Sequence, residues 1–288
     1  MNHATGRTWV LLFAWVLAAG VWCAFRPSSL PPLTNARLEA PSIEFDARGR
    51  VQVTAAPEEA VYISTDGEQP SPRAIRYQGP LPLWPDPVRC ARLSAVPTSP
   101  QWRHPLSGSP SLAVVRARSR GTHGEWGPTA TRTRMVPGIV SLPVVSLVLP
   151  PGALFDPDSG IYVVGNAVLG GDPEALAAYR HDMRWWKYPG NYHLRGDEAE
   201  RRAHVEWFEG NGAAGWSGDV DLRIHGNNTR GFPQHALRIT FKERTEPLPG
   251  MGRHRSLVLR TGGNDQDKAF MRDVVQHRAC AGAPFATA

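Results

Sequence analysis

The chain has 288 residues, of which 41% are hydrophobic and 20% are charged, so it is long enough for two domains and its composition does not mark it as disordered. The formal net charge is +6, and lysine occurs only at positions 187, 242 and 268, so arginine supplies the other 29 of the 32 basic residues. The arginines form no basic run and no aromatic-interleaved stripe, which argues against a nucleic-acid-binding protein. The three cysteines, at positions 23, 90 and 280, form neither a disulfide framework nor a metal-binding set.

The amino terminus carries an uninterrupted apolar run over residues 9–25, after Arg7. This run is slightly shorter than the roughly 20 residues of a comfortable membrane span. The small residues at 18–20 suit cleavage of an export signal. We therefore expect a signal peptide or membrane anchor at 1–25 and a proline-rich linker at 26–36. The rest of the chain is expected outside the cytoplasmic membrane, which it contacts only through this segment.

Residues 37–136 contain short strand patterns separated by turns, and no helical period interrupts them. The predicted strands are 42–45, 51–55, 60–64, 93–96, 112–118 and 129–135. Short strands at this spacing are typical of an all-β sandwich of the Ig or Fn3 kind. Proline is dense between positions 80 and 110, which confines that part to edges and loops.

Three segments of this region, 61–70, 77–81 and 115–119, include a Thr65-Asp66-Gly67 turn followed by Pro70. In this order they resemble the small sandwich domain at the carboxyl end of chitobiases and related hexosaminidases. That domain is an accessory to other activities, so the resemblance implies packing or surface attachment. Three tryptophans, Trp84, Trp102 and Trp126, can stack on sugar rings, and the alternative is that they belong to the core or an interface.

A second domain is expected to begin with a two-sided apolar strand at 139–149. A turn and strand at 154–163 and a strand at 203–208 follow, with another strand at 256–260. The Asp156-x-Asp158 pattern resembles part of a calcium loop but lacks the later bidentate glutamate, so it is interpreted as a turn.

Two helices are predicted in this second region. The first begins at Asp172-Pro173-Glu174, a capping carboxylate followed by proline and an acid, and runs to about Trp186. Its expected buried face is Leu176, Tyr179 and Met183. His181 and His193 have no ligand partners at suitable spacing and are expected on the surface. The second helix spans about 266–281, with Phe270, Val274 and Val275 as its apolar stripe and with Arg272 and Asp273 solvated.

The most informative stretch is 219–243, where two alternating strands flank a polar loop with glycines at 226 and 231. Backbone N–H groups from Gly226 to Gly231, with Arg230 beside them, can hold a phosphate. The alternative is a structural hairpin whose turn is simply solvated.

Four segments of the second region, 222–233, 237–241, 257–265 and 270–273, resemble in order and spacing the amino-terminal part of the CotH family, the spore-coat-type atypical protein kinases. The resemblance covers roughly 139–288. It implies a kinase-like α+β domain that binds ATP and magnesium and phosphorylates hydroxyl groups of a protein substrate. By this resemblance the cofactor-binding residues are Arg223, Gly226, Asn227, Asn228, Thr229, Arg230, His235 and Arg238.

The chain departs from the CotH pattern in two ways. Gln234 and His235 stand where the family usually carries lysine, which can reach a nucleotide phosphate. Lys242 cannot replace it, because seven residues span about 23 Å of extended strand and reverse the side-chain face. The chain also stops at Ala288, before the family's acidic residues, so we expect an incomplete, inactive kinase-like domain. The alternative is a non-catalytic exported binding or surface protein, attached to polysaccharide or a protein partner through the sandwich.

Overall fold

A computed structural model describes residues 38–104, 112–135, 142–166, 173–210, 212–248, 251–266 and 268–280. The expected signal or anchor segment at 1–25 and the linker at 26–36 lie outside these residues. Within the described residues, no helix combines the length and apolar character needed to cross a membrane.

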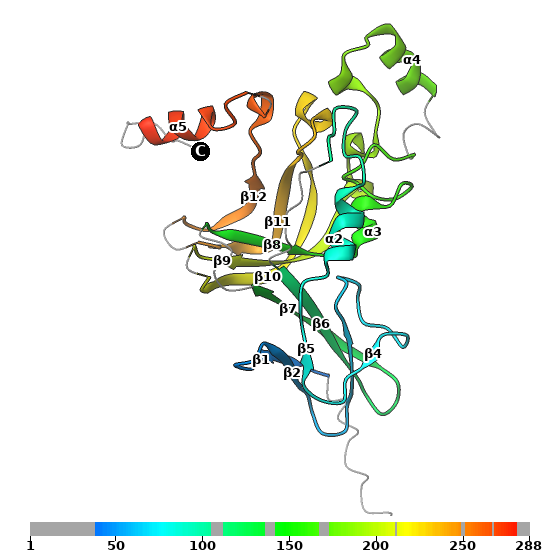
Figure 1. The fold of residues 1–288 in the computed structure, drawn as a ribbon, viewed down its shortest axis with the longest axis vertical. Helices are drawn as coiled ribbons and strands as arrows, with labels where there is room; N and C mark the ends of the chain where they lie inside the picture. The colour runs from blue at the N-terminus through cyan, green and yellow to red at the C-terminus, as the bar shows by residue number, and fades with distance from the viewer. Residues whose placement is uncertain are drawn as a thin grey trace, which may run out of the picture. The chain divides into compact units, whose positions relative to one another are not determined.

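The described chain is mainly β, as predicted, and its strands form three antiparallel sheets (Figure 1). The strands are β1 (Ser42–Phe45), β2 (Arg50–Thr54), β3 (Ala60–Ser64), β4 (Ile75–Arg76), β5 (Leu81–Pro82), β6 (Leu112–Arg120), β7 (Trp126–Met135), β8 (Val144–Val148), β9 (Arg201–Phe208), β10 (Ala214–His225), β11 (Ala236–Thr245) and β12 (His254–Leu259).

Two of the sheets come from the first region, with strand orders β1-β2-β5 and β4-β3-β6-β7. Alternate residues of their strands point into one shared core, which gives β6 a strictly alternating pattern of burial. The fully buried side chains of this core include Val51, Ile63 and Val115. The strands at 42–45 and 60–64 are confirmed to the residue, and those near 51–55, 112–118 and 129–135 within a few residues.

The predicted strand at 93–96 is wrong, because helix α2 (Pro87–Ser94) occupies this part of the chain. Asp86 caps the helix by accepting a hydrogen bond from the backbone N–H of Arg89 at 3.0 Å, and Pro87 begins it. A capping carboxylate followed by proline is a strong start signal, and here it outweighs the strand propensity of the following apolar residues.

The third sheet is a meander of five neighbouring strands in the order β12-β11-β10-β9-β8. Its central hairpin pairs Val220 with Phe241 and Ile224 with Leu237, which confirms the two strands predicted around the polar loop. One face is apolar and packs with α3 (Pro151–Phe155) residues such as Leu154. The opposite face carries the charged side chains of β9 and β10.

The chain after β8 differs from the prediction of a turn and strand at 154–163. The turn is present, because Asp156 Oδ1 accepts hydrogen bonds from the backbone N–H groups of Asp158 and Ser159. Residues 161–163 make no strand, although Ile161 and Val163 are buried. Backbone hydrogen bonds to α3, such as Tyr162 N–H to Leu154 O at 2.9 Å, satisfy this backbone instead.

Both helices predicted in the second region are shorter than expected and bury no residue. Helix α4 (Pro173–His181) ends before Met183, which is 75% exposed. Asp172 lies outside the described residues. The expected burial of Leu176, Tyr179 and Met183 is therefore wrong, and the helix stands away from the five-stranded sheet in Figure 1.

Helix α5 (Arg272–Ala279) begins six residues later than predicted, at Arg272 instead of 266. Phe270 has a φ of 62°, a left-handed conformation that an α-helix cannot contain, so the helix starts only after it. Phe270, Val274 and Val275 are exposed and form no buried stripe. Arg272 and Asp273 are not simply solvated, since they form ion pairs with Asp265 and Arg260.

Side chains of the first region contact the five-stranded sheet. The hydroxyl groups of Thr133 on β7 and Ser146 on β8 are 2.7 Å apart and hydrogen-bonded. The Gly67 turn approaches so closely that a Cβ on Gly67 would lie 2.6 Å from the carbonyl oxygen of Leu149. This turn therefore has a packing role, in addition to its positive φ of 83°.

Candidate ligand cavity

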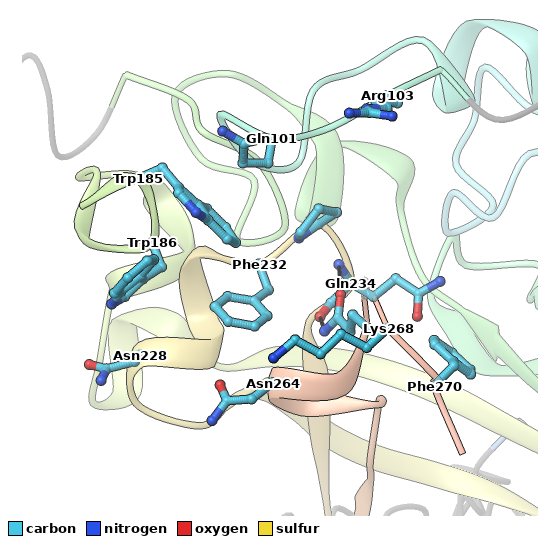
Figure 2. Close-up of a pocket in the computed structure, with 12 residues that line it drawn as sticks. Gln101, Arg103, Trp185, Trp186, Asn228, Phe232, Gln234, Asn264, Lys268 and Phe270 are labelled. Atoms are coloured by element: carbon cyan, nitrogen blue, oxygen red, sulfur yellow. Dashed lines mark hydrogen bonds between the residues drawn. The ribbon is translucent and has the colours of Figure 1, made fainter. Parts of the chain in front are cut away.

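A cavity of about 900 Å³ lies beside the loop between β10 and β11 (Figure 2). The loop contains a short 3-10 helix, η4 (Asn228–Gly231), and its residues form one side of the cavity. The other sides come from three separate segments near residues 101–103, 185–186 and 264–270. The lining residues are Gln101, Arg103, Trp185, Trp186, Asn228, Phe232, Pro233, Gln234, Asn264, Gln266, Lys268 and Phe270.

Aromatic rings form one wall of the cavity. Trp185 and Trp186 come from the 3-10 helix η1 (Trp185–Lys187), and Phe232 follows η4. The rings of Trp185 and Phe232 lie 4.9 Å apart at an angle of 37°, and Figure 2 shows all three side chains gathered on one side. A planar or ring-shaped ligand can stack on such a wall.

Apart from Pro233 and Phe270, the remaining lining is polar or cationic. Five lining residues carry side-chain amides, namely Gln101, Gln234, Gln266, Asn228 and Asn264. Arg103 and Lys268 add two positive charges, and the described lining residues include no carboxylate. The electrostatic potential of this lining therefore favours an anionic ligand.

Glycine shapes the loop at two positions. Gly226 has a φ of 115°, which a residue with a Cβ rarely adopts. At Gly231 a Cβ would lie 2.2 Å from the carbonyl oxygen of Trp186, so only glycine lets η4 pack against η1. The close packing of these two short helices brings Phe232 next to Trp185.

Arg230, predicted to assist phosphate binding, is a structural residue in this fold. It is 6% exposed, and its guanidinium donates hydrogen bonds to four backbone carbonyls, those of Gly226, Tyr192, Leu194 and Ile224, at 2.7–3.1 Å. Burial, together with Arg195 and Arg223, lowers its pKa to about 10. Because the guanidinium has five N–H donors and uses four here, it holds the loop closed and offers little to a ligand.

His235 is also interior. It is 2% exposed, its Nε2 lies 3.1 Å from the carbonyl oxygen of Thr98, and its backbone N–H donates to the hydroxyl of Tyr162. Burial lowers the pKa of His235 to about 4, so the ring is neutral at pH 7. It therefore cannot supply the positive charge of a lysine at this position.

His193, expected on the surface, is half-buried beside the Tyr192 ring at 4.8 Å. Burial and then the positive charges of Arg230 and Arg195 lower the pKa of His193 to about 4. His181, in contrast, is exposed.

The other predicted binding residues divide between the sheet and the loop. Arg223 and Arg238 are opposite each other in register, but Arg223 pairs with Glu200 at 3.6 Å and Arg238 donates to Ser256 at 3.3 Å. Asn227 accepts a 3.5 Å hydrogen bond from Arg195. Thr229 is half-buried within η4, where its carbonyl oxygen accepts from the N–H of Phe232.

Of the eight predicted binding residues, Asn228 alone lines the cavity in the described chain. Sequence reasoning missed Phe232, which belongs to the loop, and Trp185 and Lys268, which approach the loop from other segments. The sequence contained one usable signal, since lysine occurs only three times and Lys268 lies between two segments that carry the CotH resemblance, 257–265 and 270–273.

The tryptophans proposed for sugar binding differ in their surroundings. Trp126 packs edge-on against Tyr62 at 5.3 Å, and Arg118 lies 5.1 Å from its ring centroid. Trp102 is half-buried and packs against His104. Trp84 is 61% exposed, with the guanidinium of Arg134 over its ring at 4.5 Å.

In the described part of the chain, no group of three or more histidine, cysteine, aspartate or glutamate side chains is arranged to hold a metal ion. Cys90 and Cys280 are free thiols there. Comparisons of the chain with protein-family models and with curated proteins find no match.

Proposed function

We propose that the second region of this chain is a CotH-like, kinase-like domain that binds a nucleotide such as ATP in the cavity beside the β10–β11 loop. One observation carries the proposal. The loop that the family resemblance assigns to the nucleotide phosphates borders a cavity with an aromatic wall, two cations and no carboxylate among its described lining residues.

The proposed arrangement assigns different parts of the cavity to different parts of the nucleotide. The base stacks beside Trp185 and Phe232, whose rings already lie side by side. The phosphates lie near Lys268 and Arg103, which supply the positive charge that Gln234 and His235 do not. Arg230 contributes indirectly by holding the loop in shape through its four carbonyl contacts.

The family also implies magnesium and transfer of phosphate to a protein hydroxyl. The described residues offer no acidic set that fits a metal ion, so no phosphoryl-transfer step is assigned to them. Export of the chain, with a protein outside the cytoplasm as its partner, remains part of the proposal on the strength of the apolar run at 9–25.

Isothermal titration with ATP tests the binding proposal, once with magnesium and once with EDTA. We expect binding in both conditions, and at least about a tenfold loss of affinity in Lys268→Met, because one charge-assisted phosphate contact contributes about 1.5–3 kcal/mol. Lys242→Met is the matched control, since Lys242 is an exposed lysine of β11 outside the cavity. Absence of binding, or an equal effect of the two substitutions, would reject the proposal.

A second candidate function is attachment to polysaccharide through the first region, and the exposed ring of Trp84 favours it. Because Arg134 covers one face of the ring, the other face is available for a sugar. Retention on insoluble polysaccharide that Trp84→Ala abolishes would support this function. Val88→Ala, at a site 67% exposed, controls for general adhesion, and equal retention of all three proteins would count against it.

A further inference from the structure

A second cavity, of about 630 Å³, lies where β1 and β7 of the first region face β9 of the five-stranded sheet. Its charged lining residues are Glu44, Asp46, Arg132, Arg134 and Glu206, and Phe45 and Phe208 add aromatic surface. None of these residues borders the cavity beside the β10–β11 loop.

Glu206 lacks the partners that a buried carboxylate normally has. It is 3% exposed, and its Oε2 has no hydrogen-bond partner in the described structure. Its Oε1 lies 3.6 Å from Nη1 of Arg132, which is beyond hydrogen-bond distance. A buried carboxylate without a donor is costly, and natural proteins normally provide a donor from the chain, from water or from a ligand.

The neighbouring polar groups are engaged elsewhere. Ser146 lies opposite Glu206 on β8, and its hydroxyl is hydrogen-bonded to the hydroxyl of Thr133. Asp46 accepts from Arg50 at 2.6 Å, and Arg134 donates to the carbonyl of Leu83. The described chain therefore leaves one strong acceptor without a donor.

Arg132 supplies the complementary group. Its side chain is 48% exposed, and its guanidinium donates no hydrogen bond within the described part of the chain. An acceptor at Glu206 and several donors at Arg132 thus lie within 3.6 Å of each other at one cavity. A ligand group that both donates and accepts would satisfy the two side chains together.

We propose that this cavity binds a neutral, hydroxyl-rich ligand, a saccharide, through Glu206 and Arg132. A hydroxyl group donates to Glu206 and accepts from Arg132, and Phe45 and Phe208 provide apolar surface for a sugar ring. A charged ligand is disfavoured, because Glu206 and Glu44 repel an anion and Arg132 and Arg134 repel a cation. The site is independent of nucleotide binding. It shares a ligand class with the stacking site proposed at Trp84, and Arg134 borders both, but Glu206 and Arg132 belong to this cavity alone.

Titration of the full chain with neutral trisaccharides tests this site, using maltotriose, cellotriose and triacetylchitotriose. Trigalacturonate and chitotriose serve as the anionic and cationic comparators. We expect at least one neutral trisaccharide to bind, with at least a tenfold loss of affinity in Glu206→Met and no change in Trp84→Ala or in the surface control Glu58→Met. No neutral binding, binding only of a charged trisaccharide, or unchanged affinity in Glu206→Met would overturn the proposal.

Thermal unfolding without ligand separates a ligand-binding carboxylate from a structural one. In a ligand-binding site, the ligand supplies the donor that Glu206 lacks in the free protein. Glu206→Met then removes a buried charge without breaking a hydrogen bond, and we expect Tm to rise by about 3 °C. A structural role for the contact with Arg132 would instead lower Tm, and that result would overturn the proposal even if a sugar binds elsewhere.

Discussion

The Nε2 atom of His235 lies 3.1 Å from the carbonyl oxygen of Thr98, and the Oγ1 of Thr98 donates a 2.7 Å hydrogen bond to the carbonyl of Pro233. These two bonds join the segment that follows α2 to the base of the β10–β11 loop. The same segment continues to Gln101 and Arg103, which line the cavity. The geometry of the proposed ligand site therefore depends on a contact between residues 137 positions apart in the chain.

Acidification should destabilise the fold by placing a charge on the buried ring of His235. Burial lowers the pKa of His235 from 6.5 to about 4. Between these two pH values the unfolded state binds a proton at His235 and the folded state does not. Stability is therefore fully present above pH 6.5 and falls as the pH drops toward 4, by up to about 3 kcal/mol. Protonation would also place a hydrogen on Nδ1, which has no partner in the described structure.

Urea unfolding at pH 7.5 and pH 4.5 measures this loss. His193 is also held neutral by burial and titrates in the same window, so His235→Gln should remove part of the loss and leave the remainder to His193. The titratable and charged groups facing His235 are His193 and Arg230, and a positive charge on either disfavours protonation of His235. An identical pH dependence in the variant and the parent would contradict the assignment.

Arg230→Ala should destabilise the protein by about 3 kcal/mol or more, because it leaves four buried carbonyls without a donor. Arg195→Ala is the matched control, since Arg195 is exposed and makes one 3.5 Å bond to Asn227, and its cost should stay below about 0.5 kcal/mol. Denaturant unfolding compares the two. Equal stability of both variants would mean that Arg230 is free to bind ligand after all.

Gly67→Ala tests the contact between the first region and the five-stranded sheet. A methyl group would lie 2.6 Å from the carbonyl oxygen of Leu149 and would also require a φ of 83°, so we expect a loss of about 2–3 kcal/mol. Gly196→Ala has a similar φ of 75° but nothing within 4 Å, and should cost about 1 kcal/mol. Thermal unfolding that shows equal costs would argue that the turn does not pack on Leu149.

Much of the sheet structure could be predicted from the sequence, because the alternation of apolar and polar residues in a strand is visible within a few neighbouring residues. The alternation of Val220, Leu222 and Ile224 with polar residues predicts both the strand and the face that becomes buried. The two predicted helices are present, but they are shorter than predicted and their expected buried faces are wrong. Their apolar residues have helical spacing, yet neither α4 nor α5 buries a residue in the described structure, and the backbone at Phe270 interrupts the second.

The candidate site was harder to predict, since its members come from four segments. Arg230 looks like a phosphate ligand in the sequence, and only the folded chain shows the four carbonyls that surround its guanidinium. His235 likewise becomes a buried neutral ring through contacts with Thr98 and Tyr162. Trp185 and Lys268 gain their significance only when η1 and the residues before α5 meet the loop.

Photolabelling with 8-azido-ATP, followed by mapping of the labelled peptides, tests the central proposal most directly. We expect the label on the peptides that contain Trp185, Trp186 or Phe232, and we expect excess ATP to prevent it. No specific label, or label confined to peptides outside the cavity, would contradict nucleotide binding beside the β10–β11 loop.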